Sequence, residues 1–248
     1  MNLLFLVEGA KTEPKIYRSW LKFLFPGIQE VLRPEDMINN NFQIIAGCGY
    51  PNMVSRPRNS KIPSLLEACM LDLSGYSAID YLIICIDSEN ETYQNRFDEI
   101  TQKINQIILD HPKISLVHHK IYVIIQHCCI ETWALGNNEL TGGTSSLSAE
   151  ETANYEKFRE YYDIALKDPE TMECCPPHQS FRGRQRFHQK YLQYYFRMHG
   201  LKYSKNDPSE VQKSEYFLAL CRRCQSTGHL QSFQKLVQLL EKIKNDHG

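Results

Sequence analysis

Short apolar runs alternate with segments of helical spacing along the first half of the chain. Few polar residues interrupt these runs, which predicts strands buried on both faces: Leu3 to Val7, Phe42 to Ala46, Tyr81 to Ile86 and Ile121 to Ile125. Between them, apolar residues recur every three or four positions around Ile16, Leu66 and Ile104, which predicts amphipathic helices. This alternation predicts an α/β fold with a mainly parallel, doubly wound sheet flanked by helices.

The second half of the chain shows helical spacing and no comparable apolar runs. Residues 136–146 are rich in Gly, Asn and Ser, which indicates a loop or a boundary. Ser148 and Glu151 then match a helix capping box, and we expect helices at roughly 148–167, 181–199, 209–225 and 229–245. The sequence therefore predicts a first domain over residues 1–140 and a helical region over residues 141–248.

The composition is that of an ordinary globular protein. The chain has 248 residues, 42% of them hydrophobic and 23% charged, and its formal net charge of -1 gives no argument for or against a nucleic-acid partner. No apolar segment is long enough to span a bilayer, and the start lacks the features of a secretion signal. We therefore expect a cytoplasmic location, no membrane partner and reduced thiols in the nine cysteines.

Acidic residues follow two of the predicted strands at the point where each strand ends. Glu8 comes directly after the first strand, and Asp87 and Glu89 come directly after the third. Ligands collect at the carboxyl ends of parallel strands, and Mg²⁺ and Mn²⁺ prefer carboxylate oxygens. If the backbone stays extended, Asp87 and Glu89 project the same way. A metal site is one interpretation; the other is that each acid is a helix-start residue.

The same residues resemble a known family. The segment Leu-Phe-Leu-Val-Glu8-Gly9, followed by Asp87-Ser88-Glu89 after an apolar strand, resembles the TOPRIM domain of topoisomerases, primases and the OLD-type and RloB-like nucleases. The longer segment from Glu8 to Tyr17 and the segment from Cys129 to Leu135 are most similar to the RloB-like anti-phage branch. The resemblance covers about residues 1 to 135.

This resemblance implies a TOPRIM-like fold for the first domain and a metal-dependent endonuclease with Glu8, Asp87 and Glu89 as catalytic metal ligands for Mg²⁺ or Mn²⁺. The family pattern is usually Asp-x-Asp, so Glu89 is a departure at the second position. Related proteins include the TOPRIM effector of the PARIS system, which has an ATPase partner and resembles a nuclease directed at transfer RNA. The implied role is a toxin-like effector of antiviral defence that cuts RNA, including tRNA, or DNA.

Four further residues near these motifs are candidates for supporting roles. Glu131 matches a family acid that binds the metal, supports a metal ligand or hydrogen-bonds the first loop, and the sequence leaves these open. Glu13 is a candidate for supporting a metal ligand or contacting a phosphate. Lys11 and Lys120 are candidates for a phosphate contact, although lysines are more often simply exposed.

Two basic groups are candidates for binding nucleic acid. One lies in a stretch without acids and contains Arg182, Arg184, Arg186 and Lys190; the other follows the second strand and contains Arg56, Arg58 and Lys61. Aromatic residues interleave with the first group, and we expect them to pack in the core. An acidic helix precedes that group and could pair with it.

Three other patterns have weaker functional interpretations. The last helix has an apolar side, which indicates packing within the fold or a homodimer interface. Cys221 and Cys224 have zinc-ligand spacing, but there is no second matching pair. Cys174 and Cys175 with His178 could complete a site only if the fold happened to bring them to the first pair.

The alternative function is a non-catalytic TOPRIM-like module that binds a partner protein or nucleic acid.

Overall fold

The computed structural model describes every residue except 59, 142, 174, 177–179 and 248. The chain forms two compact units. The first comprises Met1–Ile86, Tyr93–Ile125 and the C-terminal residues from Lys244, and the second comprises Asp87–Thr92 and Gln126–Ile243. Residues 126–140 thus group with the C-terminal helices, whereas the sequence placed the expected boundary at 140.

The first unit contains a parallel sheet whose strand order is β2-β3-β1-β4-β5. The strands are β1 (Asn2–Val7), β2 (Gln29–Glu30), β3 (Asn41–Ala46), β4 (Tyr81–Asp87) and β5 (Ile121–Gln126). Strand β1 lies between β3 and β4, with Val7 opposite Ala46 on one side and Cys85 on the other. The predicted α/β fold with a parallel sheet is confirmed.

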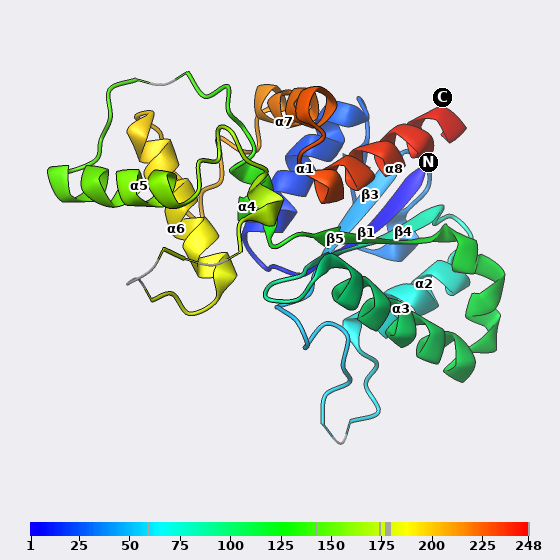
Figure 1. The fold of residues 1–248 in the computed structure, drawn as a ribbon. Helices are drawn as coiled ribbons and strands as arrows, with labels where there is room; N and C mark the ends of the chain where they lie inside the picture. Colours follow the sequence, from blue (N-terminus) through cyan, green and yellow to red (C-terminus); the bar gives the residue numbers. More distant parts are fainter. Residues whose placement is uncertain (59, 142, 174, 177–179, 248) are drawn as a thin grey trace. The chain divides into compact units, whose positions relative to one another are not determined.

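Helices cover both faces of this sheet (Figure 1). They are α1 (Thr12–Leu24), α2 (Leu65–Gly75) and α3 (Tyr93–Asp110), with a 3-10 segment η2 (Pro112–Lys120) before β5. Leu4 and Leu6 of β1 share a hydrophobic cluster with α2 and α3, whereas Phe5 points the other way and contacts Tyr17 of α1. The alternation along β1 therefore joins one strand to two helical layers.

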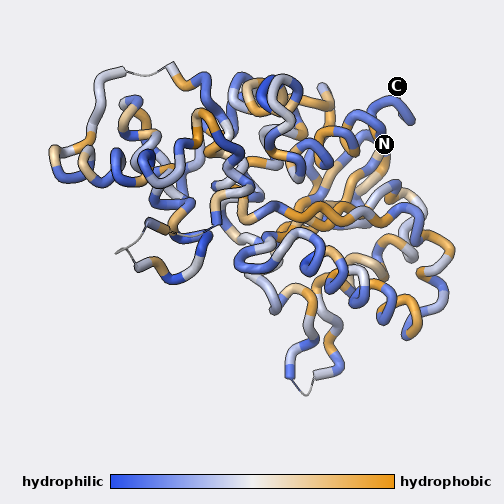
Figure 2. The backbone as a smooth tube through the Cα atoms, in the orientation of Figure 1, coloured by the Kyte–Doolittle hydropathy of each residue, from blue (hydrophilic) through white to orange (hydrophobic). Residues whose placement is uncertain are grey.

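The central strands are the most hydrophobic part of this unit, as the orange segments of Figure 2 show. All six residues of β1 are buried, as are Leu82 to Ile86 of β4. Full burial of one such aliphatic side chain stabilises the fold by about 1.5–3 kcal/mol. The absence of charge in these runs is thus explained by burial on both faces, and polar residues are confined to the strand ends.

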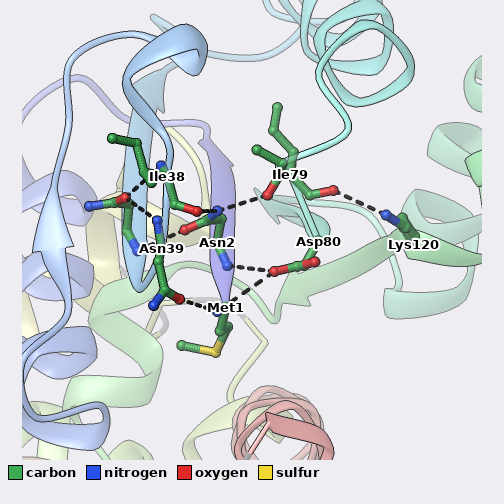
Figure 3. A network of polar contacts seen from close by, with 9 residues as sticks. Met1, Asn2, Ile38, Asn39, Ile79, Asp80 and Lys120 are labelled. Atoms are coloured by element: carbon green, nitrogen blue, oxygen red, sulfur yellow. Dashed lines mark hydrogen bonds and ion pairs between the residues drawn. The ribbon is translucent and has the colours of Figure 1, made fainter.

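A polar network lies at the amino ends of the strands (Figure 3). The Asn2 amide donates to the carbonyls of Ile38 and Ala78, and its backbone N–H donates to Asp80 at 2.8 Å. Lys120 donates to the carbonyl of Ile79 at 3.1 Å. Because the strands are parallel, Lys120 lies at their amino ends and Glu8 at their carboxyl ends. This separation does not favour the predicted phosphate contact.

The second unit is built from helices around an aromatic core. Its helices are α4 (Ile130–Ala134), α5 (Ala149–Tyr161), α6 (Arg184–Met198), α7 (Ser214–Thr227) and α8 (Gln231–His247), with a 3-10 turn η3 (Pro169–Thr171). Phe158 of α5 makes edge-to-face contacts with Phe187 and Tyr191 of α6, and both of those rings are fully buried. The expectation that the α6 aromatics pack in the core is confirmed.

The apolar side of the last helix is also used for packing within this unit. The Phe233 ring lies 5.4 Å from the Trp133 ring and 5.5 Å from the Phe217 ring, and Leu236 and Leu240 are buried. This is the interpretation that does not require a homodimer.

Some local details differ from the predictions. Helix α1 has no side-chain cap: Lys11 holds the cap position without a side-chain hydrogen bond, and Thr12 is the first helical residue. Helix α5 keeps the Ser148–Glu151 capping box but ends at Tyr161, because the backbone of Tyr162 is extended. A two-residue β2 and a 3-10 turn η1 (Pro34–Asp36) were not predicted. No helix of the described residues is long and apolar enough to cross a membrane.

Candidate functional site

Glu8 is held by the two segments next to it in the first unit. Its backbone N–H donates to the Cys85 carbonyl at 3.1 Å, which continues the pairing of β1 with β4. Its carboxylate accepts from the backbone N–H of Tyr50 at 3.2 Å, in the loop after β3. The residue is only 6% exposed. A buried carboxylate fixed by main-chain donors has a defined direction, as a metal ligand requires.

Glu13 supports the loop that follows Glu8. Its carboxylate accepts from the backbone N–H of Gly9 at 3.0 Å, and the residue is buried. A Cβ atom at Gly9 would collide with that carboxylate, so the Glu8-Gly9 pair allows the close approach. Lys11 is exposed in the same loop. The structure therefore gives Glu13 a loop-bracing contact, while a phosphate contact by Lys11 stays a prediction.

Asp87 and Glu89 belong to the second unit, with the end of β5. The Asp87 carboxylate accepts from the Gln126 side-chain amide at 2.6 Å. Ser88 and Glu89 donate their backbone N–H groups to the carbonyls of Gln126 and Cys128. Glu89 has a φ of 51°, in the left-handed region. The backbone is therefore not extended at Glu89, so the condition under which both acids would project the same way is not met.

The three acids thus come from both units, and a shared metal site for them stays a prediction. Within its own unit each carboxylate has an identified hydrogen-bond donor or turn that orients it: the Tyr50 N–H for Glu8, the Gln126 amide for Asp87 and the left-handed turn for Glu89. Carboxylate oxygens suit Mg²⁺ or Mn²⁺ better than a thiophilic ion.

Glu131 is paired inside the second unit. It is 1% exposed, its carboxylate accepts from the Tyr203 hydroxyl at 2.9 Å, and Lys205 lies at 3.6 Å. These contacts add a structural role to the possibilities that the sequence left open. The contact could not be predicted, because Tyr203 is 72 residues further along the chain.

The predicted basic residues after β3 differ in their exposure and in whether they form ion pairs. Arg56 donates from Nε to the Glu67 carboxylate at 2.7 Å, so it is engaged in an ion pair with a buried acid. Hydrogen bonds from Arg56 and His111 lower the pKa of Glu67 to about 2. Arg58 and Lys61 are exposed. Arg56 is therefore a structural residue of the loop as well as a candidate for binding phosphate.

On and before α6 the basic residues are less constrained. Arg182 and Arg186 are exposed, and the Lys190 ammonium lies 4.4 Å from the centre of the Tyr194 ring. Arg184 begins the helix and is partly buried. The expected pairing with the acidic helix occurs through Arg197, which donates to Glu151 at 2.8 Å.

A thiol and imidazole group was not predicted from the sequence. Among the described residues, Cys128, Cys129 and His188 are the group of three metal-ligating side chains whose ligand atoms lie within 4.8 Å of one another, and all three are buried. Cys129 and the nearby His188 lower the pKa of the Cys128 thiol, and burial raises the pKa of Cys129.

This thiol and imidazole group has the contacts of a polar element of the core. Both ring nitrogens of His188 are occupied, one by the Thr132 hydroxyl at 2.7 Å and the other by the Met172 carbonyl at 2.9 Å. A metal would have to displace one of these bonds. Cys224 is buried and Cys221 is half-buried on α7, while Cys174 and His178 lie outside the described residues.

No family model, curated protein or solved structure matches this chain.

Proposed function

We propose that this chain is a divalent-metal-dependent nuclease of TOPRIM type, with Glu8, Asp87 and Glu89 as ligands of Mg²⁺ or Mn²⁺. The observation that supports this most is the strand order. The chain adds β3 on one side of β1 and then β4 on the other, so the order reverses between β1 and β4. In open parallel sheets, ligands bind outside the carboxyl ends of the strands at such a reversal.

Acidic residues lie at the ends of both strands at this reversal. Val7 pairs with Cys85, so Glu8 follows the end of β1 and Asp87 is the last residue of β4. Strands β2 and β3 end instead with Glu30, which pairs with Arg18, and with Ala46. A metal ion bound by such acids polarises a phosphodiester and lowers the pKa of a bound water.

The remaining parts of the proposal come from the resemblance to the RloB-like branch. They are an RNA substrate such as tRNA, or DNA; a partner ATPase; a role as effector of anti-phage defence; and a cytoplasmic location. The near-neutral net charge of -1 means that substrate attraction would depend on local groups such as Arg184 rather than on the whole surface.

Charge-neutral variants of the acids test this proposal. Glu8→Gln and Asp87→Asn keep the size of each side chain and one oxygen acceptor but remove the negative charge. Loss of a ligand should weaken Mn²⁺ binding and lower cleavage of tRNA or single-stranded DNA by about 100-fold or more, since the ion contributes several kcal/mol to the transition state. Calorimetry with Mn²⁺ and a gel assay of cleavage measure the two effects.

Glu150→Gln is the matched control, because Glu150 is an exposed acid in the first turn of α5. It should bind Mn²⁺ and cleave as the wild type does. Full metal-dependent cleavage by both site variants would contradict the proposal.

The non-catalytic alternative is favoured by one observation, the left-handed backbone of Glu89, which turns the third acid away from simple alternation with Asp87. A purified protein that binds nucleic acid but neither Mn²⁺ nor Mg²⁺ would select this alternative.

A further inference from the structure

A cavity in the second unit begins directly after the acidic segment. Its volume is about 630 Å³, and it is lined by Asn90, Glu91 and Thr92 and by His127, Phe181 and Arg184 among others. This volume is in the range of sites for small ligands. Asn90 immediately follows Glu89, one of the proposed metal-binding acids.

His127 offers a hydrogen-bond donor to this cavity. Burial and the nearby Arg184 lower its pKa, which favours the neutral ring. Its Nδ1 lies 2.7 Å from the Ser88 hydroxyl and 3.5 Å from Nη2 of Arg184. Arginine only donates, so Nδ1 is the acceptor and the ring proton is on Nε2. Within the described part of the chain, Nε2 has no hydrogen-bond partner.

Arg184 offers a positive charge at the same place. Its backbone N–H donates to the Asn90 side chain at 3.2 Å, which attaches the start of α6 to the acidic segment. Its Nε is buried and makes no hydrogen bond to any residue that the structure describes. Arg184 also lines the cavity, and the planar donors of a guanidinium are well arranged for an anionic oxygen.

We propose that this cavity binds a phosphate-bearing nucleotide of the substrate, with Arg184 and Nε2 of His127 donating to the phosphate. The inference rests on the proposed nuclease function, which supplies the substrate class. Phe181 gives the cavity an apolar wall, and its ring packs against Phe158 and Phe187. Such a wall is suited to one face of a base.

The acids that line the cavity affect the conditions under which a phosphate binds. Glu91 and Glu173 also line the cavity, as does Glu170, whose carboxylate accepts from the Trp133 indole N–H and from Ser232. Two carboxylates beside one arginine repel a bare phosphate dianion. We therefore expect the nucleotide to bind together with a divalent cation, and more tightly when Mn²⁺ is present than when it is absent.

Binding of adenosine 5′-monophosphate tests this inference without any need for cleavage. Calorimetry of the full chain with Mn²⁺ should show binding, and Arg184→Gln should weaken it tenfold or more, because a charge-assisted bond is lost. His127→Asn removes the donor at the Nε2 position, while His127→Gln retains an amide donor there. The Asn variant should therefore bind more weakly than the Gln variant.

Arg159→Gln is the control, since Arg159 is an exposed arginine of α5 that does not line the cavity. It should bind as the wild type does, and melting temperatures of all variants report whether they fold. Adenosine alone should not bind, and inorganic phosphate should bind more weakly than the nucleotide.

Several results would overturn the inference: no binding to the wild type, unchanged binding by Arg184→Gln in a folded protein, or equal binding of adenosine and its monophosphate. The proposed function fails separately. Nucleotide binding that depends on Arg184, together with undiminished cleavage by Glu8→Gln and Asp87→Asn, would retain the cavity and reject the metal-binding acids.

Discussion

At the residue scale, Glu89 combines a costly backbone with a candidate ligand. Its φ of 51° lies where residues with a Cβ are disfavoured by about 1–2 kcal/mol, and Gly is the residue that adopts this region freely. Strain of this kind persists where the surroundings hold it, and it is concentrated at functional sites. Here the surrounding bond is from the Glu89 N–H to the Cys128 carbonyl at 2.9 Å.

We therefore predict opposite effects of Glu89→Gly on stability and on metal binding. The free energy of unfolding should rise by up to about 1 kcal/mol as the strain is relieved, while Mn²⁺ binding weakens because a carboxylate is lost. Glu89→Ala is the matched variant: it loses the carboxylate but keeps the Cβ. Urea unfolding and calorimetry separate the two effects, and equal stability of the Gly and Ala variants would argue against strain at this position.

At the element scale, α3 holds the loop that orients Glu8. The Arg96 guanidinium lies 3.9 Å from the centre of the Tyr50 ring and donates to Glu99 at 2.7 Å, and the Tyr50 hydroxyl also donates to Glu99. Burial and the bond to Glu99 raise the pKa of Tyr50 to about 12, so the hydroxyl stays a donor. The backbone N–H of the same tyrosine contacts the Glu8 carboxylate.

Arg96 is thus a positioning residue for Glu8, and Arg96→Gln should weaken Mn²⁺ binding by roughly threefold to tenfold through the loosened loop. Stability should also fall, by about 1–3 kcal/mol, since Arg96 is buried. Arg18→Gln removes the ion pair between Arg18 of α1 and Glu30 of β2, and it is the control for loss of an arginine in the same unit. Unchanged metal affinity in a destabilised Arg96→Gln protein would leave the residue a purely structural role.

At the scale of the whole molecule, the sequence predicted what depends on local periodicity. Strand β1 was found because it is an uninterrupted apolar run, and helix α3 because its apolar residues recur every three or four positions. Strand β2 has only two residues, which are too few for a periodic pattern to show in the sequence. Helix α5 was expected to be longer because nothing in the sequence marks its end at Tyr161.

The residues of the candidate site also divide into those that the sequence could place and those that it could not. Glu8 and Asp87 could be placed at strand ends because each terminates an apolar run. The left-handed Glu89 and the approach of Arg184 to Asn90 could not, because the first depends on a turn with no Gly and the second joins residues 94 apart in sequence. Long-range polar contacts have no periodic signal, so the sequence identified the candidate ligands but not the residues that orient them.

One long-range contact makes the stability of the whole molecule depend on pH. Glu170 is 7% exposed and accepts from Ser232 and from the Trp133 indole, joining η3 to α4 and α8. Burial raises its pKa from 4.5 to about 7. The folded protein therefore binds this proton more tightly than the unfolded chain. The stabilisation is fully present below about pH 4.5 and is lost as the pH rises through about 7.

The shift corresponds to a loss on the order of 3 kcal/mol between these limits. Glu170→Gln resembles the protonated acid and should remove this part of the pH dependence. We expect the variant and the wild type to have similar free energies of unfolding at pH 5 and the variant to be the more stable at pH 8, as measured by urea denaturation. Other groups titrate in both proteins, so the difference between the two curves isolates Glu170; a constant difference from pH 5 to 8 would show that its carboxyl keeps the same charge in the folded and unfolded states.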